Sequence, residues 1–337
     1  MLGTSRLMRL GIPAFLCLVV ASVATAAQAS VHGGSSVVTF RAGHFQLNGK
    51  PFFPVMALLT FCPTPDTVGE LVALDVNVIE GYALSCTPTG GTLADGEQTL
   101  HNALQGRVLW VDEAPSPNYY PQDLPELVTW TGDRAYDDRD GSRLLQCAPN
   151  AIASAYDNIA KAVTKGPVIL RVSLAQDGGV QQANLSCLTA PRVGSLISTA
   201  IAAGAAGVEF VTQSRGNGNA HPDLLFDLPQ GLASGLTQRM DALKPVLPAV
   251  LQGELLTPLR ISPSSVKGAA WHYRNKVFVL ATNTGDTSAT AALTSPRIGG
   301  SSAQVLGENR PVQTHSGTMS DRFKPLVFHI YESAFKP

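Results

Sequence analysis

The sequence has little net charge and no second long apolar run, and each shortage excludes a class of protein. Charged side chains make up 15% of the 337 residues and the formal net charge is −1. No basic stripe is present, so a nucleic-acid partner is not expected. Beyond the N-terminal segment, no apolar run approaches the roughly 20 residues that a membrane-spanning helix needs. The mature chain is therefore predicted to lack a membrane span.

Cysteine is also scarce, which limits the possible crosslinks and metal sites. Of five cysteines, Cys17 lies in the N-terminal apolar run, which leaves Cys62, Cys86, Cys147 and Cys187. If the chain is secreted, as its N-terminal segment predicts (see the next paragraph), an even number favours two disulfides. Of the three possible pairings, Cys62–Cys86 and Cys147–Cys187 are preferred because each joins successive segments of one layer. No short Cys-x-x-Cys or His-x-x-x-His spacing supports the rival zinc site. No metal or other cofactor is predicted.

The first 29 residues have the pattern of a secretory signal peptide. Arg6 and Arg9 precede an apolar core at residues 10–24, and small residues follow at 24–29. The alternative is a membrane anchor, but the run is short for a span. The protein is therefore predicted to be secreted or extracytoplasmic.

Strand-like and helix-like segments alternate from residue 55 to residue 256. They follow a predicted hairpin at residues 37–47 and a tight turn at Asn48-Gly49. Strands are predicted at residues 55–59, 76–79, 107–111, 127–130, 168–174 and 207–211. Helices are predicted at residues 67–74, 97–104, 150–163, 193–203 and 232–251, the last interrupted at Pro245 and Pro248. This alternation predicts an α/β domain with a mostly parallel sheet.

The composition changes after residue 256. Short alternating runs are separated there by Gly, Asn, Asp, Ser and Pro, which predicts a small antiparallel β-sandwich. The predicted parts are a signal peptide at 1–29, an α/β domain with an N-terminal hairpin at 30–256, and the sandwich at 257–337.

Four segments are similar to motifs of one enzyme class. Residues 45–54 (FQLNGKPFFP) are similar to a hairpin of the type F-x-V-D/N-G-K-P-F-F, and residues 74–79 (LDVNVI) to a second strand of the type G-F-N-x-V. Residues 202–210 are similar to a late-barrel A-x-G-A-x-G-I-x-Y-F motif, and residues 321–331 to the last strands of a sandwich. In this order the chain resembles secreted glycoside hydrolases with a (β/α)₈ barrel and a C-terminal β-sandwich. The resemblance implies a TIM-barrel-like fold.

The strand count departs from that fold. Six central strands are found where a closed barrel needs eight. Either two strands are too irregular to recognise, or the barrel is shortened and incomplete.

The catalytic motif departs from the family as well. Such enzymes usually carry Trp, two or three residues, and then Asp-Glu-Pro, with the Glu as proton donor. Here Trp130 and Asp133 are present, but Arg134 stands where the donor Glu is expected. Arginine cannot donate a proton at neutral pH, and beside Asp133 it favours the ionised carboxylate. The resemblance therefore implies a diverged acid/base motif.

Hydrolysis needs a second carboxylate facing the first across the bond. Asp133, Glu80 and Glu113 are catalytic candidates at predicted strand ends, and Asp177 is a possible nucleophile. A strand-end acid can equally be a solvated or paired loop residue. Glu209 lies inside an apolar strand, where it is either a buried functional group or part of an exposed edge.

Aromatic side chains near the strand ends suit sugar binding, since their faces stack on pyranose rings. The candidate substrate-binding residues are Tyr82, Trp110, Trp130, Arg134, Tyr136 and Gln213. The alternative for any single aromatic is core packing. Residues 137–141 (DDRDG) cluster oxygen ligands but lack the spaced series of a calcium loop, so a solvated turn is expected.

The sequence thus supports two hypotheses. The first is a secreted glycoside hydrolase-like protein acting on an oligo- or polysaccharide. The second is a non-catalytic relative that binds glycans or has a structural role at the cell envelope.

Overall fold

A six-stranded parallel sheet lies at the centre of the fold. The computed structural model describes residues 36–41, 43–59, 61–81, 83–112, 128–130, 137–140, 151–173, 189–211 and 231–337, all of them within one compact unit, Val31–Pro337. The strands are β4 (Val55–Leu59), β5 (Val78–Gly81), β6 (Leu109–Asp112), β8 (Asp137–Asp140), β9 (Val168–Ser173) and β10 (Gly207–Val211). Their order is β6-β5-β4-β10-β9-β8, and every neighbouring pair is parallel. The predicted parallel sheet is confirmed.

Helices connect the strands, close to the predicted positions. They are α1 (Pro65–Ala73), α2 (Leu93–Leu104), α3 (Ala151–Ala162), α4 (Ala190–Ala202), α5 (Leu232–Leu243) and α6 (Leu247–Gln252). Capping side chains define two of the starts. The Thr64 hydroxyl accepts the N–H of Thr67 at 3.1 Å before α1, and Thr92 and Asp95 form a reciprocal capping box at α2. The break between α5 and α6 falls around Pro245, as predicted.

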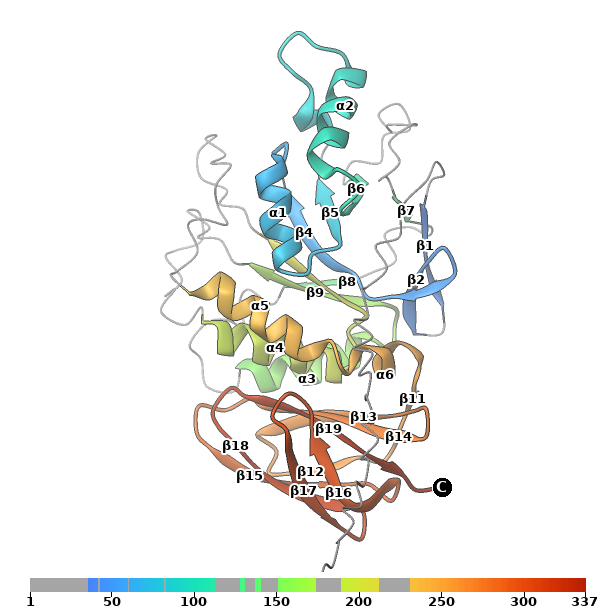
Figure 1. The fold of residues 1–337 in the computed structure, drawn as a ribbon, viewed down its shortest axis with the longest axis vertical. Helices are drawn as coiled ribbons and strands as arrows, with labels where there is room; N and C mark the ends of the chain where they lie inside the picture. The colour runs from blue at the N-terminus through green and yellow to red at the C-terminus, as the bar shows by residue number, and fades with distance from the viewer. Residues whose placement is uncertain are drawn as a thin grey trace, which may run out of the picture. The chain divides into compact units, whose positions relative to one another are not determined.

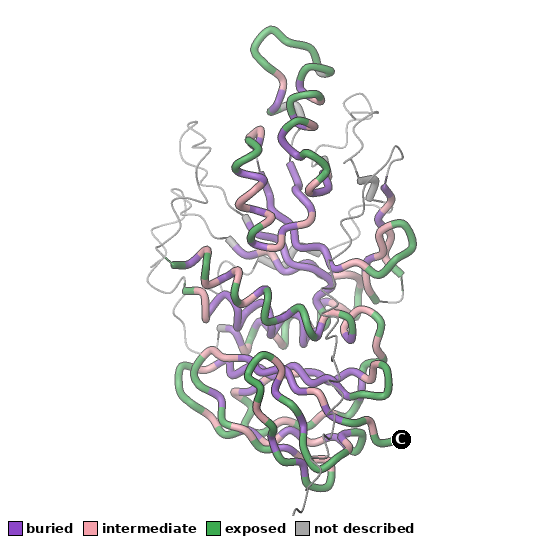
Figure 2. Tube along the Cα trace, viewed as in Figure 1, coloured by how far each residue is buried: buried purple, intermediate pink, exposed green. Residues whose placement is uncertain are grey.

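The helices pack against one face of the parallel sheet. Alternate strand residues point to that face, and they form one buried cluster with apolar side chains of the helices. The strand members include Leu59, Ile79, Trp110, Leu170 and Phe210, each at most 1% exposed. The buried trace along these strands is visible in Figure 2. The core therefore lies between the sheet and its helices.

A small hairpin sheet packs on the opposite face. It has the order β3-β2-β1-β7, with β1 (Ser36–Arg41), β2 (His44–Leu47), β3 (Lys50–Phe52) and β7 (Val128–Trp130). Asn48 and Gly49 both have positive φ between β2 and β3, which confirms the predicted turn. Val38 and Phe45 of this sheet pack against the central strands.

The predicted strand at residues 127–130 forms, but not where the sequence analysis placed it. Instead of joining the central sheet, β7 pairs in parallel with β1 of the hairpin sheet, with Val38 opposite Trp130. A short apolar run specifies an extended segment but not its neighbour, because the neighbour depends on the path of the chain between strands.

Residues 137–140 were predicted to form a solvated turn, and this was wrong. They form β8, the last strand of the central sheet among the described residues, in parallel register with β9 from Asp137–Val168 to Asp140–Arg171. Aspartate is depleted in strands, so local propensity concealed the strand. Pairing with β9 overrides that propensity.

The C-terminal region is a curled antiparallel sheet of nine strands. They are β11 (Glu254–Leu255), β12 (Arg260–Ser262), β13 (Val266–Tyr273), β14 (Lys276–Asn283), β15 (Ala289–Thr294), β16 (Ile298–Val305), β17 (Arg310–His315), β18 (Thr318–Phe323) and β19 (Phe328–Phe335). Their order is β11-β13-β14-β19-β16-β17-β18-β15-β12. The antiparallel arrangement is as predicted. One continuous sheet replaces the predicted two-sheet sandwich, since a short β17–β18 ladder joins its halves.

The sheet encloses a core of its own. Side chains of strands from both halves, among them Val279, Leu293, Val305, Phe323 and Tyr331, share one buried cluster. The order of the nine strands begins at β11 and ends at β12. The last strand nevertheless lies close to β13, since the Ile261 side chain of β12 is 3.0 Å from the position that a Cβ on Gly268 of β13 would occupy. The sheet therefore curls until its far end contacts β13.

Helices α3 and α4 lie between the two sheets (Figure 1). The Tyr156 hydroxyl of α3 donates to the Gly268 carbonyl of β13 at 3.2 Å. The hydroxyls of Ser198 on α4 and Thr282 on β14 are 2.9 Å apart and both residues are buried. Side chains of β13, β14 and β19 also belong to the same buried cluster as the helices. The two sheets thus share one helical layer.

Candidate functional site

Charged side chains lie on the sheet face opposite the helices. Met56 of β4 lies opposite both Val78 of β5 and Glu209 of β10, and Glu209 lies opposite Arg171 of β9. Residues paired between neighbouring strands project from the same face, and so does a residue two positions further along a strand. Glu80 therefore lies on this face as well, one row nearer the carboxyl ends of the strands.

Arg171 and Glu209 form an ion pair within this face. The Arg171 Nε lies 2.5 Å from Glu209 Oε2, and the Glu209 side chain is fully buried while that of Arg171 is 26% exposed. A carboxylate removed from water in this way is tolerated only with charged or hydrogen-bonding partners. Because β10 lies between β4 and β9, the exposed-edge alternative for Glu209 is wrong. The pair lies on the same sheet face as Glu80, one row nearer the amino ends of the strands.

Glu80 is buried next to the carboxyl end of β5, with 3% of its surface exposed. The predicted strand that ends near Glu80 is confirmed. The catalytic role of Glu80 stays a prediction. Gly81 follows it, and a Cβ there would lie 2.6 Å from the Leu59 carbonyl oxygen and 2.8 Å from the Trp110 ring. Glycine therefore lets the end of β5 pack closely between its neighbours. Two strand spacings and two residues separate Glu80 from Glu209, which corresponds to about 12 Å between their Cα atoms.

The hairpin sheet covers the amino-terminal part of the same face. Val38 and Phe45 pack there against Met56, Val78 and Ile169, which lie early in their strands. Glu80 lies beyond this apolar contact, toward the carboxyl ends. That end is where sites assemble in barrel proteins, because the strand-to-helix loops converge there.

A disulfide lies at the same end of the sheet. Cys62 follows β4 and Cys86 ends the short 3₁₀ helix Ala83–Cys86 that follows β5, and their sulfur atoms are bonded. The first predicted pairing is confirmed. Cys147 and Cys187 lie outside the described residues. The bond joins the loops after β4 and β5, beside Glu80 and Gly81.

Replacing Cys62 and Cys86 together with serine is expected to lower the free energy of unfolding by about 3 kcal/mol. The bond closes a loop with a sequence separation of 24, and a crosslink of that span restricts the unfolded chain by about this amount. Urea denaturation followed by circular dichroism measures the loss. The double alanine variant serves as a control, since it should lose a similar amount if the crosslink is the cause. A loss below about 1 kcal/mol in both variants would contradict the prediction.

Trp110 was predicted to bind substrate, and this was wrong. Its side chain is fully buried and belongs to the cluster formed with the helices. It lies opposite Ile79 of β5 in the ladder, one residue out of phase with Glu80, and so on the other face of the sheet. Alternation along β6 explains the error, because a one-residue step reverses the direction of a side chain.

Asp133, Glu113, Asp177, Tyr82, Arg134, Tyr136 and Gln213 lie outside the described residues. Trp130 ends β7 in the hairpin sheet, where only its backbone is described. The structure thus brings together Glu80, Glu209 and Arg171.

A second charged network links β17, β18 and β19 in the antiparallel sheet. Arg310 Nη1 and Nη2 donate to the two Asp321 carboxylate oxygens at 3.0 and 2.7 Å, and Arg310 Nε donates to Glu308 at 2.6 Å. The Tyr331 hydroxyl donates to Asp321 at 2.9 Å, and the His329 ring nitrogen contacts Glu308. Sequence analysis missed this network because its members are spread over strands that pair only in the folded sheet.

The pKa of Asp321 is lower than its usual value. Burial of the carboxyl group raises the pKa, but hydrogen bonds from Arg310, Tyr331 and the Arg322 N–H together outweigh burial. The folded state therefore favours the ionised form of Asp321 more than the unfolded chain does.

Asp321→Asn is expected to cost about 2 kcal/mol of stability at pH 7, because hydrogen bonds to a charged group are lost. A lowered folded-state pKa contributes stability above the unfolded value of about 4, and this contribution is lost as pH falls through the folded pKa. The difference between the wild type and the variant should therefore shrink below about pH 4. Urea denaturation at several pH values measures it. Glu254→Gln, at a 79% exposed carboxylate, is the control, and a difference that grows in acid would contradict the prediction.

Within the described residues, no cluster of three or more His, Cys, Asp or Glu side chains is arranged to hold a metal ion. No helix in that part of the chain combines the length and apolarity needed to span a membrane.

The fold is mixed α/β, with a helix-covered parallel sheet followed by a large curled antiparallel sheet. No family model and no curated protein matches the chain. Similar solved structures include an α-amylase from Anoxybacillus, with 14% identity and a TM-score of 0.40 over 81% of this chain and 64% of that one. AmyP in complex with maltotriose has 10% identity and a TM-score of 0.48, over 83% and 97% of the two chains. A GH30 endoxylanase from Clostridium papyrosolvens has 8% identity and a TM-score of 0.38, over 89% and 100%.

Proposed function

We propose that the chain is a secreted glycoside hydrolase-like protein that binds an oligo- or polysaccharide at the carboxyl ends of β4, β5, β9 and β10. The observation that carries the proposal is the position of Glu80, a buried carboxylate on the sheet face that the helices leave uncovered. It lies at the end of the sheet where barrel enzymes place their reacting groups. The hairpin that precedes β4 agrees with the hairpin of the resembling family.

In this proposal Glu80 supplies one carboxylate, and Glu113, Asp133 or Asp177 supplies the other. Glu209 is fully buried and paired with Arg171, so it supports the site rather than reaching a sugar. Tyr82, Tyr136, Trp130, Arg134 and Gln213 remain proposed sugar contacts, and the 257–337 region remains a proposed separate domain.

A non-catalytic glycan-binding role is the second candidate. Arg134 stands where the family donor is expected, and the ion pair of Glu209 removes one more carboxylate from use. The same strand-end site would then hold a saccharide without cleaving it.

A hydrolysis screen on plant and bacterial polysaccharides separates the two candidates. In the catalytic case Glu80→Gln, Glu113→Gln or Asp133→Asn should lower turnover at least about 100-fold, as expected when an acid or base is removed. Glu254→Gln, at an exposed carboxylate in the antiparallel sheet, should leave turnover unchanged. Absence of hydrolysis together with binding on a glycan array that survives Asp133→Ala would indicate the binding protein. Absence of both would reject the proposed function.

Secretion is part of the proposal. A disulfide between Cys62 and Cys86 is compatible with an oxidising compartment. Detection of the processed chain outside the cytoplasm of an expressing cell, with its N-terminus near residue 30, tests it.

A further inference from the structure

The ladder between β17 and β18 stops after two residue pairs. Among the described residues it contains only Thr314–Met319 and His315–Thr318. Continued register would place Gln313 opposite Ser320, but the strands separate there. Each strand keeps its other neighbour, since β17 pairs with β16 and β18 with β15. The separation therefore opens a wedge inside an otherwise continuous sheet.

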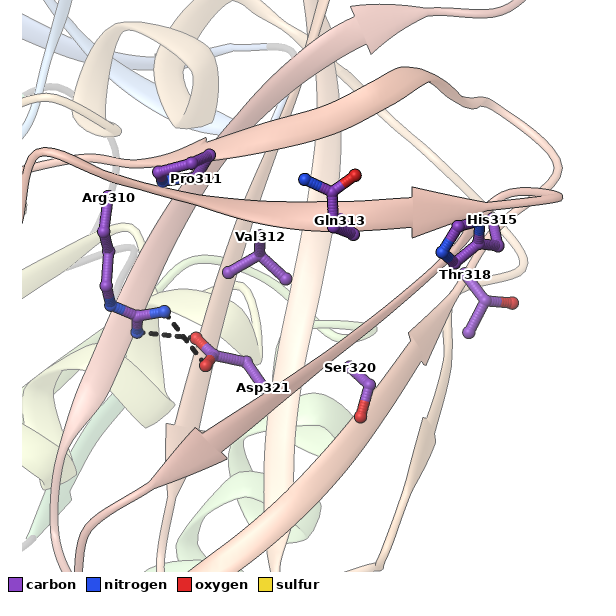
Figure 3. Close-up of a pocket in the computed structure, with 8 residues that line it drawn as sticks. All are labelled: Arg310, Pro311, Val312, Gln313, His315, Thr318, Ser320 and Asp321. Carbon is purple, nitrogen blue, oxygen red and sulfur yellow. Dashed lines mark hydrogen bonds and ion pairs between the residues drawn. The ribbon is translucent and has the colours of Figure 1, made fainter.

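The wedge forms a pocket of about 460 Å³. Figure 3 shows Arg310 on β17 reaching toward Asp321 on β18 at one end, with the Val312 side chain on the same side of β17 and the Gln313 side chain on its other side. Ser320 also lines the pocket. Val312 is buried, whereas Gln313 and Ser320 are exposed to solvent. This volume falls within the range of small-molecule sites, which is roughly 300–1,000 Å³.

The pocket offers both donors and acceptors of hydrogen bonds without an excess of positive charge. The guanidinium of Arg310 is neutralised by Asp321 and Glu308, and these contacts use three of its five N–H groups. One N–H on each terminal nitrogen has no partner among the described residues. The amide of Gln313 and the hydroxyl of Ser320 add further donors and acceptors on the exposed face of the two strands, where Pro311 supplies apolar surface, while Val312 lies on the buried face.

We propose that this pocket is a second saccharide site, which takes a neutral sugar with several hydroxyl groups. A pyranose presents hydroxyls that donate and accept together with an apolar C–H face, and the walls of the pocket match both. An anion is disfavoured because two carboxylates already surround Arg310. The site is separate from the strand-end site of the parallel sheet, so it does not depend on cleavage there.

An extended peptide is the competing occupant. A strand inserted between β17 and β18 would need about 4.8 Å on each side. It would also have to break the bidentate Arg310–Asp321 contact that spans the wedge. The observations therefore favour a small ligand.

Titration of the ¹⁵N-labelled full chain with maltotriose, xylotriose and laminaritriose tests the proposal by NMR. At least one trisaccharide should shift the resonances of Gln313, His315 and Ser320, and the double variant Gln313→Ala, Ser320→Ala should weaken that binding at least tenfold. Thr290→Ala, at an exposed position on β15 outside the pocket, should not. Glu80→Gln should also leave the response of the pocket unchanged, which separates this site from the proposed strand-end site.

Three outcomes would overturn the proposal. The first is the absence of any pocket response to these sugars at concentrations up to tens of millimolar. The second is a response that the double variant does not weaken. The third is preferential binding of inorganic sulfate or of an extended peptide at the same resonances.

Discussion

Arg171→Met is expected to lower the free energy of unfolding by about 3–5 kcal/mol, the usual cost of removing one partner of a buried ion pair. The Glu209 side chain is fully buried and lies 2.5 Å from Arg171. Without the guanidinium, its carboxylate would stay in the sheet without that charge, or would have to take up a proton. Urea denaturation followed by circular dichroism and by tryptophan fluorescence measures the loss, and coincident transitions would support a two-state analysis.

Lys244→Met is the matched control for the Arg171 variant. Lys244 also contacts carboxylates, Asp241 at 2.6 Å and Asp75 at 2.7 Å, but its side chain is 52% exposed. An exposed pair of this kind contributes less than about 1 kcal/mol. The double variant Arg171→Met, Glu209→Leu should lose less than the sum of its single variants, because it leaves no carboxylate without its partner. Equal losses from Arg171→Met and Lys244→Met would show that the buried pair is not a major source of stability.

The Arg171–Glu209 pair also shows how far the sequence could predict the site. Each residue is a single charge inside an apolar strand segment, and the two strands are consecutive among those predicted. Opposite charges in successive buried strands are a signal for a pair, and it could have been used. The sequence could not give the register that places them opposite each other, because register depends on how the connecting segment packs.

Helices and apolar strands were predictable because their periodicity is local. The spacing of apolar residues placed α3 and α4 within a few residues of their observed ends, and β9 and β10 follow apolar runs that each contain one charged residue. One strand was missed, because the four charged residues of β8 have low strand propensity. This strand forms through pairing with β9, and a local sequence pattern does not show which strands pair.

The same limit explains the error at residues 127–130. Their apolar character predicted a strand correctly, but the alternation of strands and helices along the chain assigned that strand to the central sheet. In the structure it extends the hairpin sheet beside β1. The likeness of the hairpin at residues 45–54, by contrast, rests on a tight turn and a following strand that are close in sequence, and that prediction held.

Trp110→Ala is expected to cost about 3–5 kcal/mol, because removing a buried aromatic side chain leaves a large cavity. The indole ring is fully buried and lies 2.8 Å from the position that a Cβ on Gly81 would occupy. It therefore fills the space beside the end of β5, on the helix side of the sheet. Its N–H has no hydrogen-bond partner among the described residues, so Trp110→Phe should cost less, about 1–2 kcal/mol.

A measurement of sugar affinity distinguishes a packing role of Trp110 in the core from its predicted role in substrate binding. If Trp110 only packs the core, the folded fraction of Trp110→Phe should bind a saccharide with the affinity of the wild type. Urea denaturation gives the stability, and titration at a temperature where the variant is fully folded gives the affinity. A variant that keeps its stability but loses at least tenfold in affinity would restore Trp110 to the binding site. The position of its ring argues for the opposite result, because Trp110 packs with the helices on the sheet face opposite to that of Glu80.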